Sequence, residues 1–293
     1  DAGLEVDLAE AADLRQRARG LGIVAVGDPA DHARLVAHAD LAHLDARPEL
    51  VGQVLDQVTE IDPSVSGEVK DRLAAVELVL DPDQLHLHAA LDDPAQVQDQ
   101  YSAQINAHIF DAPLRWDYMA RPVRLVPNTT LDLPEVSSDF RTFTLRIRPG
   151  IWFQDDPAFK GQRRELVADD YAYSIKRVFD PRWKSQMLFE LEPAKILGLD
   201  EARQRALKDT PFDYAAPIEG LRALDRYTLQ IKLAEPSPRF LYNLADGSFT
   251  GALAREVVKF YGDRVGEHPV GTGPFVLKDW KRSSRIVLAK NPR

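Results

Sequence analysis

Hydrophobic and polar side chains alternate most regularly over residues 143–148, where every second residue is apolar. A period of two is typical of a strand with one buried face. The dipeptide Pro149-Gly150 follows and indicates a turn. Residues 151–153, Ile-Trp-Phe, then resume an extended, aromatic run. The pattern therefore predicts two strands joined by a tight turn.

The next periodic stretch predicts a helix over residues 169–179. Asp169 and Asp170 stand where it begins, and negative charge stabilises a helix N-terminus. Asp180-Pro181 ends it, because the residue before a proline avoids the helical conformation. Its apolar positions recur at helical spacing and are Tyr171, Ile175, Val178 and Phe179.

Residues 1–80 show a mostly helical pattern that is interrupted by one strand-like run, Ile23–Val26. Apolar residues on both sides of this run recur every three or four positions, as on an amphipathic helix. The four predicted helices begin near Leu4, Asp28, Arg47 and Ser64 or Ser66, and the second of them carries Leu35 and Val36.

The rest of the chain shows both the alternation that is typical of strands and the three-to-four-residue spacing that is typical of helices. Alternation predicts strands over residues 85–89, 227–233 and 285–289, and helical spacing predicts a helix over residues 95–110. The segment Glu235-Pro236-Ser237-Pro238 breaks the chain before a short helix near Phe240. Strands and helices in this mixed order indicate an α/β architecture.

Eight residues of the central elements form a motif: Arg148, Gly150, Phe153, Ala168, Asp169, Asp170, Ser174 and Arg177. In this order, the motif closely resembles the signature of the family 5 extracellular solute-binding proteins, the peptide- and nickel-type receptors of ABC importers. The chain departs from the family at Val167, where a Thr usually stands, and at Asp155-Asp156, where Asp-Gly is usual. Both departures affect a local cap or turn.

Further matches extend the resemblance over about residues 84–293. They are the turn at Leu91–Pro94, the line from Asp225 to Leu233, the segment Pro269–Phe275 and the pair Asn291-Pro292. The resemblance implies a periplasmic binding protein-like lobe in which helices flank a mixed β-sheet. We therefore expect two domains, an acidic, mostly helical region over residues 1–83 and the first lobe of such a receptor over residues 84–293. The family's second lobe has no counterpart in this sequence, so we expect this lobe by itself to bind ligand weakly.

Composition narrows the function classes. The chain has 293 residues, 44% of them hydrophobic and 28% charged, with a net charge of −9. Residues 1–93 hold 20 acidic against 7 basic side chains, a net of −13, and this balance argues against nucleic acid as a partner. No cysteine is present, which removes disulfides and thiolate chemistry. No apolar run approaches the roughly 20 residues of a membrane span.

Several local patterns admit a chemical interpretation beside a structural one. Gly271-Thr272-Gly273 lacks the lysine of a phosphate loop and is followed by proline, so a backbone turn is favoured. His86 and His88 share a strand face, but no ligand set accompanies them, and we predict no metal or cofactor. Asp169-Asp170 fits helix capping better than paired catalytic carboxylates. No serine lies in a nucleophile elbow, so no enzymatic activity is expected.

Candidate ligand contacts come from the resemblance. Such receptors hold their ligand between two lobes, and the first lobe usually contributes residues from its first strand and the helix that follows, and from the segment before the Gly-Thr-Gly turn. Aromatic rings would supply contact area, and polar side chains would pair with a peptide. Phe110 and Phe249 are equally compatible with a place in the core. The predicted contacts are Tyr101, Ser102, Phe110, Asp111, Asp246, Gly247, Ser248 and Phe249.

The resemblance implies an exported, periplasmic protein that captures peptides or other small polar solutes and delivers them to an ABC permease in the inner membrane. The sequence begins at Asp1 and shows no signal peptide. Two other classes stay open: a sensor or regulator that keeps the same receptor lobe, and an enzyme on a related scaffold. A signal peptide at the start of the gene would exclude a cytoplasmic regulator, and a perturbed carboxylate beside a nucleophile would favour the enzyme.

Overall fold

The computed structural model describes residues 23–26, 34–37, 77–79, 93–97, 100–208, 210–281 and 285–293. The chain divides into two compact units. The first comprises Asp1–His88 and Leu277–Lys290, and the second comprises Ala89–Val276 and Asn291–Arg293. The strand pair near the C-terminus thus groups with the N-terminal residues, whereas the boundary expected near residue 84 stays a prediction.

The first unit contains a five-stranded mixed sheet in the order β1-β2-β3-β11-β10. β1 pairs antiparallel with β2, β2 runs parallel to β3, and β11 is antiparallel to β3. Its strands are β1 (Ile23–Val26), β2 (Arg34–Ala37), β3 (Glu77–Val79), β10 (Phe275–Lys281) and β11 (Arg285–Lys290).

This sheet tests three of the sequence predictions. The strands expected at Ile23–Val26 and over residues 285–289 are confirmed as β1 and β11. The helix expected to carry Leu35 and Val36 is wrong there, because both residues lie on β2, where they face Ala25 and Val24 of β1. A short apolar run fits either period, and sheet pairing decides between them. The other helices predicted in residues 1–80, and the strand over residues 85–89, lie outside the described residues.

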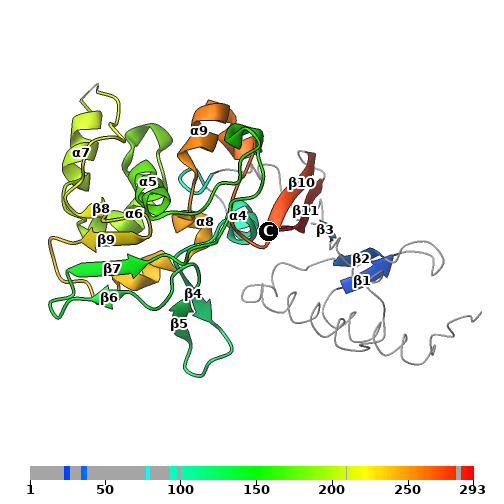
Figure 1. Cartoon of the computed structure of the whole chain (residues 1–293), viewed down its shortest axis with the longest axis horizontal. Coiled ribbons are helices and arrows are strands. Elements are labelled where there is room, and N and C mark those ends of the chain that lie inside the picture. The colour runs from blue at the N-terminus through cyan, green and yellow to red at the C-terminus, as the bar shows by residue number, and fades with distance from the viewer. Residues whose placement is uncertain are drawn as a thin grey trace, which may run out of the picture. The chain divides into compact units, whose positions relative to one another are not determined.

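The second unit is built on a four-stranded antiparallel sheet in the order β6-β7-β9-β8 (Figure 1). Phe143 and Leu145 of β7 lie opposite Ile231 and Leu229 of β9, and all four side chains are buried. The alternation predicted for this stretch is thereby confirmed. The strands are β6 (Glu135–Val136), β7 (Thr142–Arg146), β8 (Leu221–Ala223) and β9 (Thr228–Lys232).

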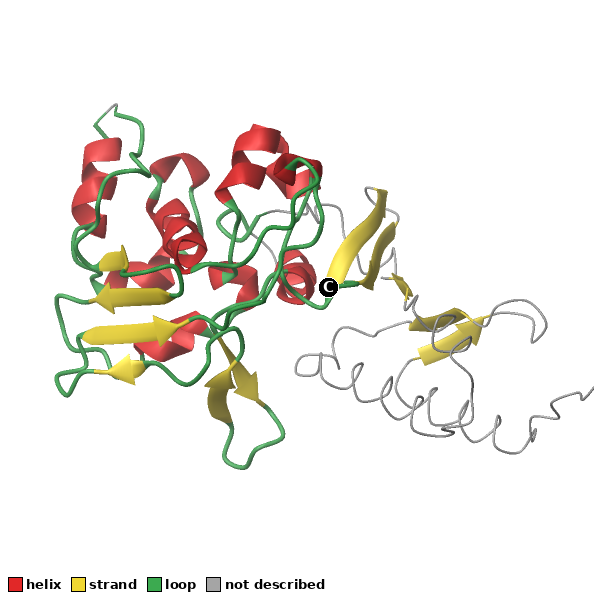
Figure 2. Cartoon of the chain, in the orientation of Figure 1, coloured by secondary structure: helices red, strands yellow, loops and turns green. Residues whose placement is uncertain are grey.

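Helices cover the apolar face of this sheet, and α5 (Ala168–Phe179) packs on β8 and β9 (Figure 2). The predicted start of α5 is confirmed, because the Asp170 carboxylate accepts the Val167 amide at 2.9 Å and so caps the helix. The other helices are α4 (Gln100–Ile109), α6 (Leu188–Leu191), α7 (Leu199–Ala206), α8 (Gly247–Thr250) and α9 (Arg255–Tyr261), and the 3-10 helices span Pro157–Phe159, Pro181–Trp183, Glu192–Ala194, Phe240–Leu244 and Gly262–Glu267.

Two predicted elements differ from the structure. The run at residues 151–153 forms a single bridge, Trp152 to Glu165, in place of a strand. The helix expected from residue 95 begins at Gln100, because residues 93–97 form a turn in which the Asp93 carboxylate accepts the Ala95 amide at 2.9 Å. Asp and Asn side chains stabilise such turns in competition with helix.

A buried ion pair fastens this turn to α5. The Arg177 guanidinium donates to the Asp93 carboxylate, and both side chains are only 1% exposed. Arg177 also lies over the Trp183 ring at 4.2 Å from its centroid. Removing either partner would leave an uncompensated charge in the core. Arg177, identified above as part of the family motif, therefore has a structural role in this chain.

Two further features complete the second unit. A separate two-stranded sheet joins β4 (Leu114–Asp117) to β5 (Arg124–Pro127) and projects from the body of this unit (Figure 1). In the part of the chain that the structure describes, no helix combines the length and the apolar character that a membrane crossing needs.

Candidate functional site

Three segments that are far apart in the sequence meet at the C-terminal end of α4. They are the residues that follow this helix, the short helix α8, and the turn Gly271-Thr272-Gly273. α4 and α8 are in contact, and the amide of Gly273 donates to the carbonyl of Ile109 at 2.8 Å. The fold thus brings residues 110–111 and 246–249, both predicted from the family resemblance, into one region.

Glycine permits this close approach. A Cβ atom on Gly247 would lie 2.1 Å from the carbonyl oxygen of Phe110, and one on Gly271 would lie 1.9 Å from that of Ile109. Real Cβ atoms do not approach a carbonyl oxygen so closely, so a side chain at either position would push the segments apart. The two glycines therefore set the distance between α4, α8 and the turn.

The Asp111 carboxylate links this region to its surroundings. Its Oδ1 accepts from Nδ2 of Asn128 at 3.1 Å, and its Oδ2 accepts from the Thr272 hydroxyl at 3.0 Å. Burial raises the pKa of Asp111 above its ordinary value, and the two hydrogen bonds act in the opposite direction. Asp111 still keeps some exposed surface.

The backbone of Asp111 is held as well. Its carbonyl accepts from the Tyr171 hydroxyl at 3.0 Å and from the Ala252 amide at 3.2 Å. The Tyr171 hydroxyl is also hydrogen-bonded to Thr129 Oγ1 at 2.6 Å. Burial raises the pKa of Tyr171 well above its ordinary value, so this hydroxyl stays protonated and can donate. α5 thereby anchors the residues at the end of α4.

α8 begins with a capping interaction. Oδ1 of Asp246 accepts from the Ser248 amide at 2.8 Å and from its hydroxyl at 2.6 Å. The Asp246 carbonyl accepts the Thr250 amide at 2.9 Å. A side-chain oxygen at the N-cap satisfies an amide that the helix itself leaves without a partner. The polar groups of Asp246 and Ser248 are therefore arranged around the first turn of α8.

The eight predicted ligand contacts differ in how far they are exposed to solvent. Ser102, Phe110 and Ser248 are buried. Of the two positions that the sequence allows for Phe110, ligand contact or core, the structure shows the core. Asp111, Asp246, Gly247 and Phe249 are partly exposed. The Tyr101 side chain lies outside the described residues. Among the seven predicted contacts whose burial the structure describes, these four partly exposed residues offer surface to a ligand, and their role as contacts stays a prediction.

Sequence reasoning missed three residues of this region. Asn128 and Thr272 hold the Asp111 carboxylate, and Tyr171 holds its carbonyl. Helical spacing predicts only a core position for Tyr171, and the glycines beside Thr272 predict only a turn. A polar side chain beside two turn glycines is the one signal that pointed toward Thr272.

The described residues add no support for catalysis by the Asp169-Asp170 pair or for a metal site. Asp170 caps α5 and forms a two-pronged pair with Arg164, with nitrogen–oxygen distances of 3.0 and 2.7 Å. Burial raises the pKa of Asp170 to about 6, while its hydrogen bonds to Arg164 lower it. No group of three or more potential metal-binding side chains is found within the described residues, and His86 and His88 lie outside them.

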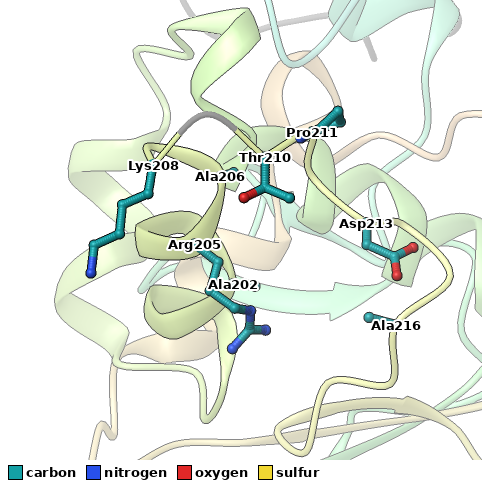
Figure 3. A pocket seen from close by; sticks show the side chains of 8 residues that line it. All are labelled: Ala202, Arg205, Ala206, Lys208, Thr210, Pro211, Asp213 and Ala216. Atoms are coloured by element: carbon teal, nitrogen blue, oxygen red, sulfur yellow. The ribbon is translucent and has the colours of Figure 1, made fainter.

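A separate pocket of about 260 Å³ lies between α7 and the loop at residues 210–216 (Figure 3). The loop is anchored to α5, because the Lys176 amine donates to the carbonyls of Tyr214 and Ala216 at 3.1 and 3.0 Å. The Asp213 carboxylate is engaged by the Ala215 amide at 2.9 Å. The residues lining this pocket are Ala202, Arg205, Ala206, Lys208, Thr210, Pro211, Asp213 and Ala216.

Solved structures show which class of protein has this fold. The chain superposes on Listeria monocytogenes OppA bound to peptide with a TM-score of 0.57 at 19% identity, covering 70% of this chain and 37% of the other. For a periplasmic oligopeptide-binding protein of Borrelia burgdorferi the TM-score is 0.56 at 25% identity, covering 69% and 37%. The fold is that of a periplasmic binding protein, as predicted.

Sequence comparison gives the family. The model for bacterial extracellular solute-binding proteins, family 5 middle, matches residues 124–293, so the chain belongs to this family. Di/tripeptide-binding protein 2 of Pseudomonas aeruginosa (strain UCBPP-PA14) is 29% identical over 210 residues, which are 68% of this chain and 35% of that protein. Periplasmic oligopeptide-binding protein OppA of Escherichia coli (strain K12) is 26% identical over 202 residues, or 68% and 34%. The chain spans about a third of the length of these relatives.

Proposed function

We propose that the chain is the substrate-binding component of an ABC importer, which captures peptides or peptide-like solutes and delivers them to a permease in the inner membrane. Membership of family 5 carries this proposal. Support comes from relatives whose names describe di/tripeptide and oligopeptide binding. The proposed location is the periplasm, in keeping with the name of the Escherichia coli relative.

Ligand contact is proposed for the surface around Asp111, Gly247 and Phe249. These residues are partly exposed and sit on segments that the glycine contacts and the Asp111 hydrogen bonds hold in place. A site held in a fixed arrangement loses less conformational entropy on binding. The proposed mechanism is capture by closure of two lobes, without covalent chemistry.

Calorimetry with defined peptides tests this function. We expect heat of binding with dipeptides and tripeptides and none with the corresponding mixture of free amino acids. We propose that residues 84–293 form one of these two lobes, so for this part of the receptor we expect a dissociation constant in the range of about 0.1–1 mM, weaker than for a cleft that encloses its ligand on both sides. Absence of binding to every peptide length at millimolar concentration would contradict the proposal.

A further inference from the structure

The β4–β5 hairpin presents a group of exposed apolar side chains at its turn. The hairpin tip, residues 118–123, carries Met119, Val123 and Tyr118, which are 64%, 46% and 38% exposed. Single exposed apolar residues are ordinary on protein surfaces, whereas a group of them marks a site of interaction. Phe189 and Phe260 are exposed to a similar degree but lie on different helices, α6 and α9.

Hydrogen bonds between polar groups of the hairpin tip order its backbone. The Asp117 carboxylate accepts the amides of Met119 and Ala120, both at 3.2 Å. The Arg121 guanidinium donates to the carbonyls of Tyr118 and Ala120 at 2.6 and 3.0 Å. An apolar surface that is already ordered loses little entropy when a partner covers it. The tip is thus built as a fixed protrusion.

The base of the hairpin is fastened to the second unit. Trp116 of β4 packs against Tyr242 with ring centroids 5.2 Å apart. The Pro113 carbonyl accepts the amides of Asn128 and Thr129 at 3.1 and 3.2 Å. These two bonds close the base of the hairpin, at the end opposite the tip. Figure 1 shows the two strands extending away from the four-stranded sheet.

Charge distinguishes the hairpin from the chain as a whole. Residues 114–127 carry three arginines, Arg115, Arg121 and Arg124, against one acid, Asp117, a net of +2 in a chain of −9. Tyr, Met and Arg are the side chains enriched at the centre of protein interfaces, and lysine is depleted there. Lipid surfaces are typically recognised by clusters of about 4–8 cationic residues. Three arginines fall short of that number, so the hairpin fits a protein partner better than a bilayer.

We propose that the hairpin tip docks on the permease of the importer, in an apolar hollow that carries carboxylates at its rim. This inference rests on the proposed function, since it names the surface through which the receptor reaches its permease. Met119 and Val123 fill the hollow. Arg124, whose side chain is 70% exposed and pairs with Asp117 of the same hairpin at 3.4 Å, keeps surface that faces the carboxylates. Because the attraction is partly ionic, docking weakens as salt is raised.

The chain contains no cysteine, so one introduced residue reports on the tip alone. In the Met119→Cys protein, a maleimide probe is expected to react rapidly in free solution. Permease–ATPase complex in nanodiscs should slow this reaction at least tenfold, whereas empty anionic nanodiscs should not. Phe189→Cys is the matched control, and its labelling rate should stay the same in all three conditions.

Slow labelling in free receptor would show that another part of the chain or a second copy covers the tip. Protection by empty nanodiscs would identify lipid as the partner. Either result overturns the proposal.

A functional readout accompanies the labelling. The Met119→Ser/Val123→Ser double variant is expected to need at least tenfold more receptor for half-maximal stimulation of the permease ATPase, with peptide affinity within twofold of the parent. Phe189→Ser/Phe260→Ser should match the parent in both measurements. Equal stimulation by the hairpin variant refutes this docking surface alone. A parent protein that neither binds peptide nor stimulates the ATPase refutes the proposed function and this inference with it.

Discussion

The hydroxyl of Thr272 donates to Oδ2 of Asp111 across 3.0 Å and thereby joins the Gly271-Thr272-Gly273 turn to the end of α4. Asn128 holds the other carboxylate oxygen. Because burial raises the pKa of Asp111 and Thr272 opposes that rise, the bond has a measurable signature.

Replacing Thr272 with Val removes the donor and keeps the shape of the side chain. We expect the pKa of Asp111 to rise further in this variant, and the free energy of unfolding near neutral pH to fall by about 1–2 kcal/mol. Carbon-detected NMR titration of the Asp111 carboxyl gives the first value, and urea denaturation gives the second. Thr142→Val, on β7, is a control. An unchanged Asp111 pKa would show that the hydrogen bond does not form in solution.

Asp170 should give the stability of the protein a specific pH dependence. Burial raises its pKa from 3.8 to about 6 in the folded chain, so the folded state binds a proton between these values and the unfolded state does not. The stability that this proton on Asp170 adds to the folded state is present in full below pH 3.8 and is lost as the pH rises through about 6. In urea denaturation across this window, Asp170→Asn should lack the decline that the parent shows. Asp169→Asn, at the exposed neighbouring position, should keep it. Parallel profiles for Asp170→Asn and the parent would contradict this assignment.

The close approach at Gly247 and Gly271 predicts a cost for any Cβ atom. Alanine at either position would place this atom about 2 Å from a carbonyl oxygen of Phe110 or Ile109. We expect each substitution to lower the free energy of unfolding by about 2–3 kcal/mol, because the backbone must shift. Gly161→Ala serves for comparison. Its φ of +76° strains an alanine, but no atom lies within 4 Å of the new Cβ, so about 1 kcal/mol is expected there. Equal costs at all three positions would rule out the packing explanation.

The buried pair of Asp93 and Arg177 predicts a large effect from a single truncation. Asp93→Ala leaves the Arg177 charge buried without its partner, and we expect a loss of about 3–5 kcal/mol in thermal or urea unfolding. The exposed pair of Arg182 and Asp263 is the matched control, and Asp263→Ala should cost less than about 1 kcal/mol. Similar losses for the two variants would mean that water reaches the Asp93 carboxylate.

How far the fold could be predicted depended on the length of each pattern. The alternation around Phe143 and the acidic start of α5 specify their elements locally, and both are confirmed. The four-residue run that contains Leu35 is too short to separate helix from strand, and its pairing with β1 decided the outcome. Trp152 makes one isolated bridge, to Glu165, and α5 begins three residues further on, at Ala168, so little chain is left for a longer strand pair.

The candidate region was predicted only in part, and through family resemblance. Periodicity says nothing about which loops meet, so the hydrogen bond from Thr272 to Asp111 could not be derived from spacing. The burial of Ser102 and Phe110 likewise depends on tertiary packing. Resemblance did select Asp111 and Gly247, which the fold brings together, although their contact with a ligand stays a prediction.

We propose that a peptide binds at the surface formed by Asp111, α8 and the Gly271-Thr272-Gly273 turn. Two-dimensional amide NMR of the isotope-labelled chain during titration with a tripeptide would locate this binding surface. We expect concentration-dependent shifts of the amide signals of residues 246–249 and 271–273, and unchanged signals for the pocket at residues 202–216. Shifts confined to that pocket, or none at a large excess of peptide, would contradict this proposal.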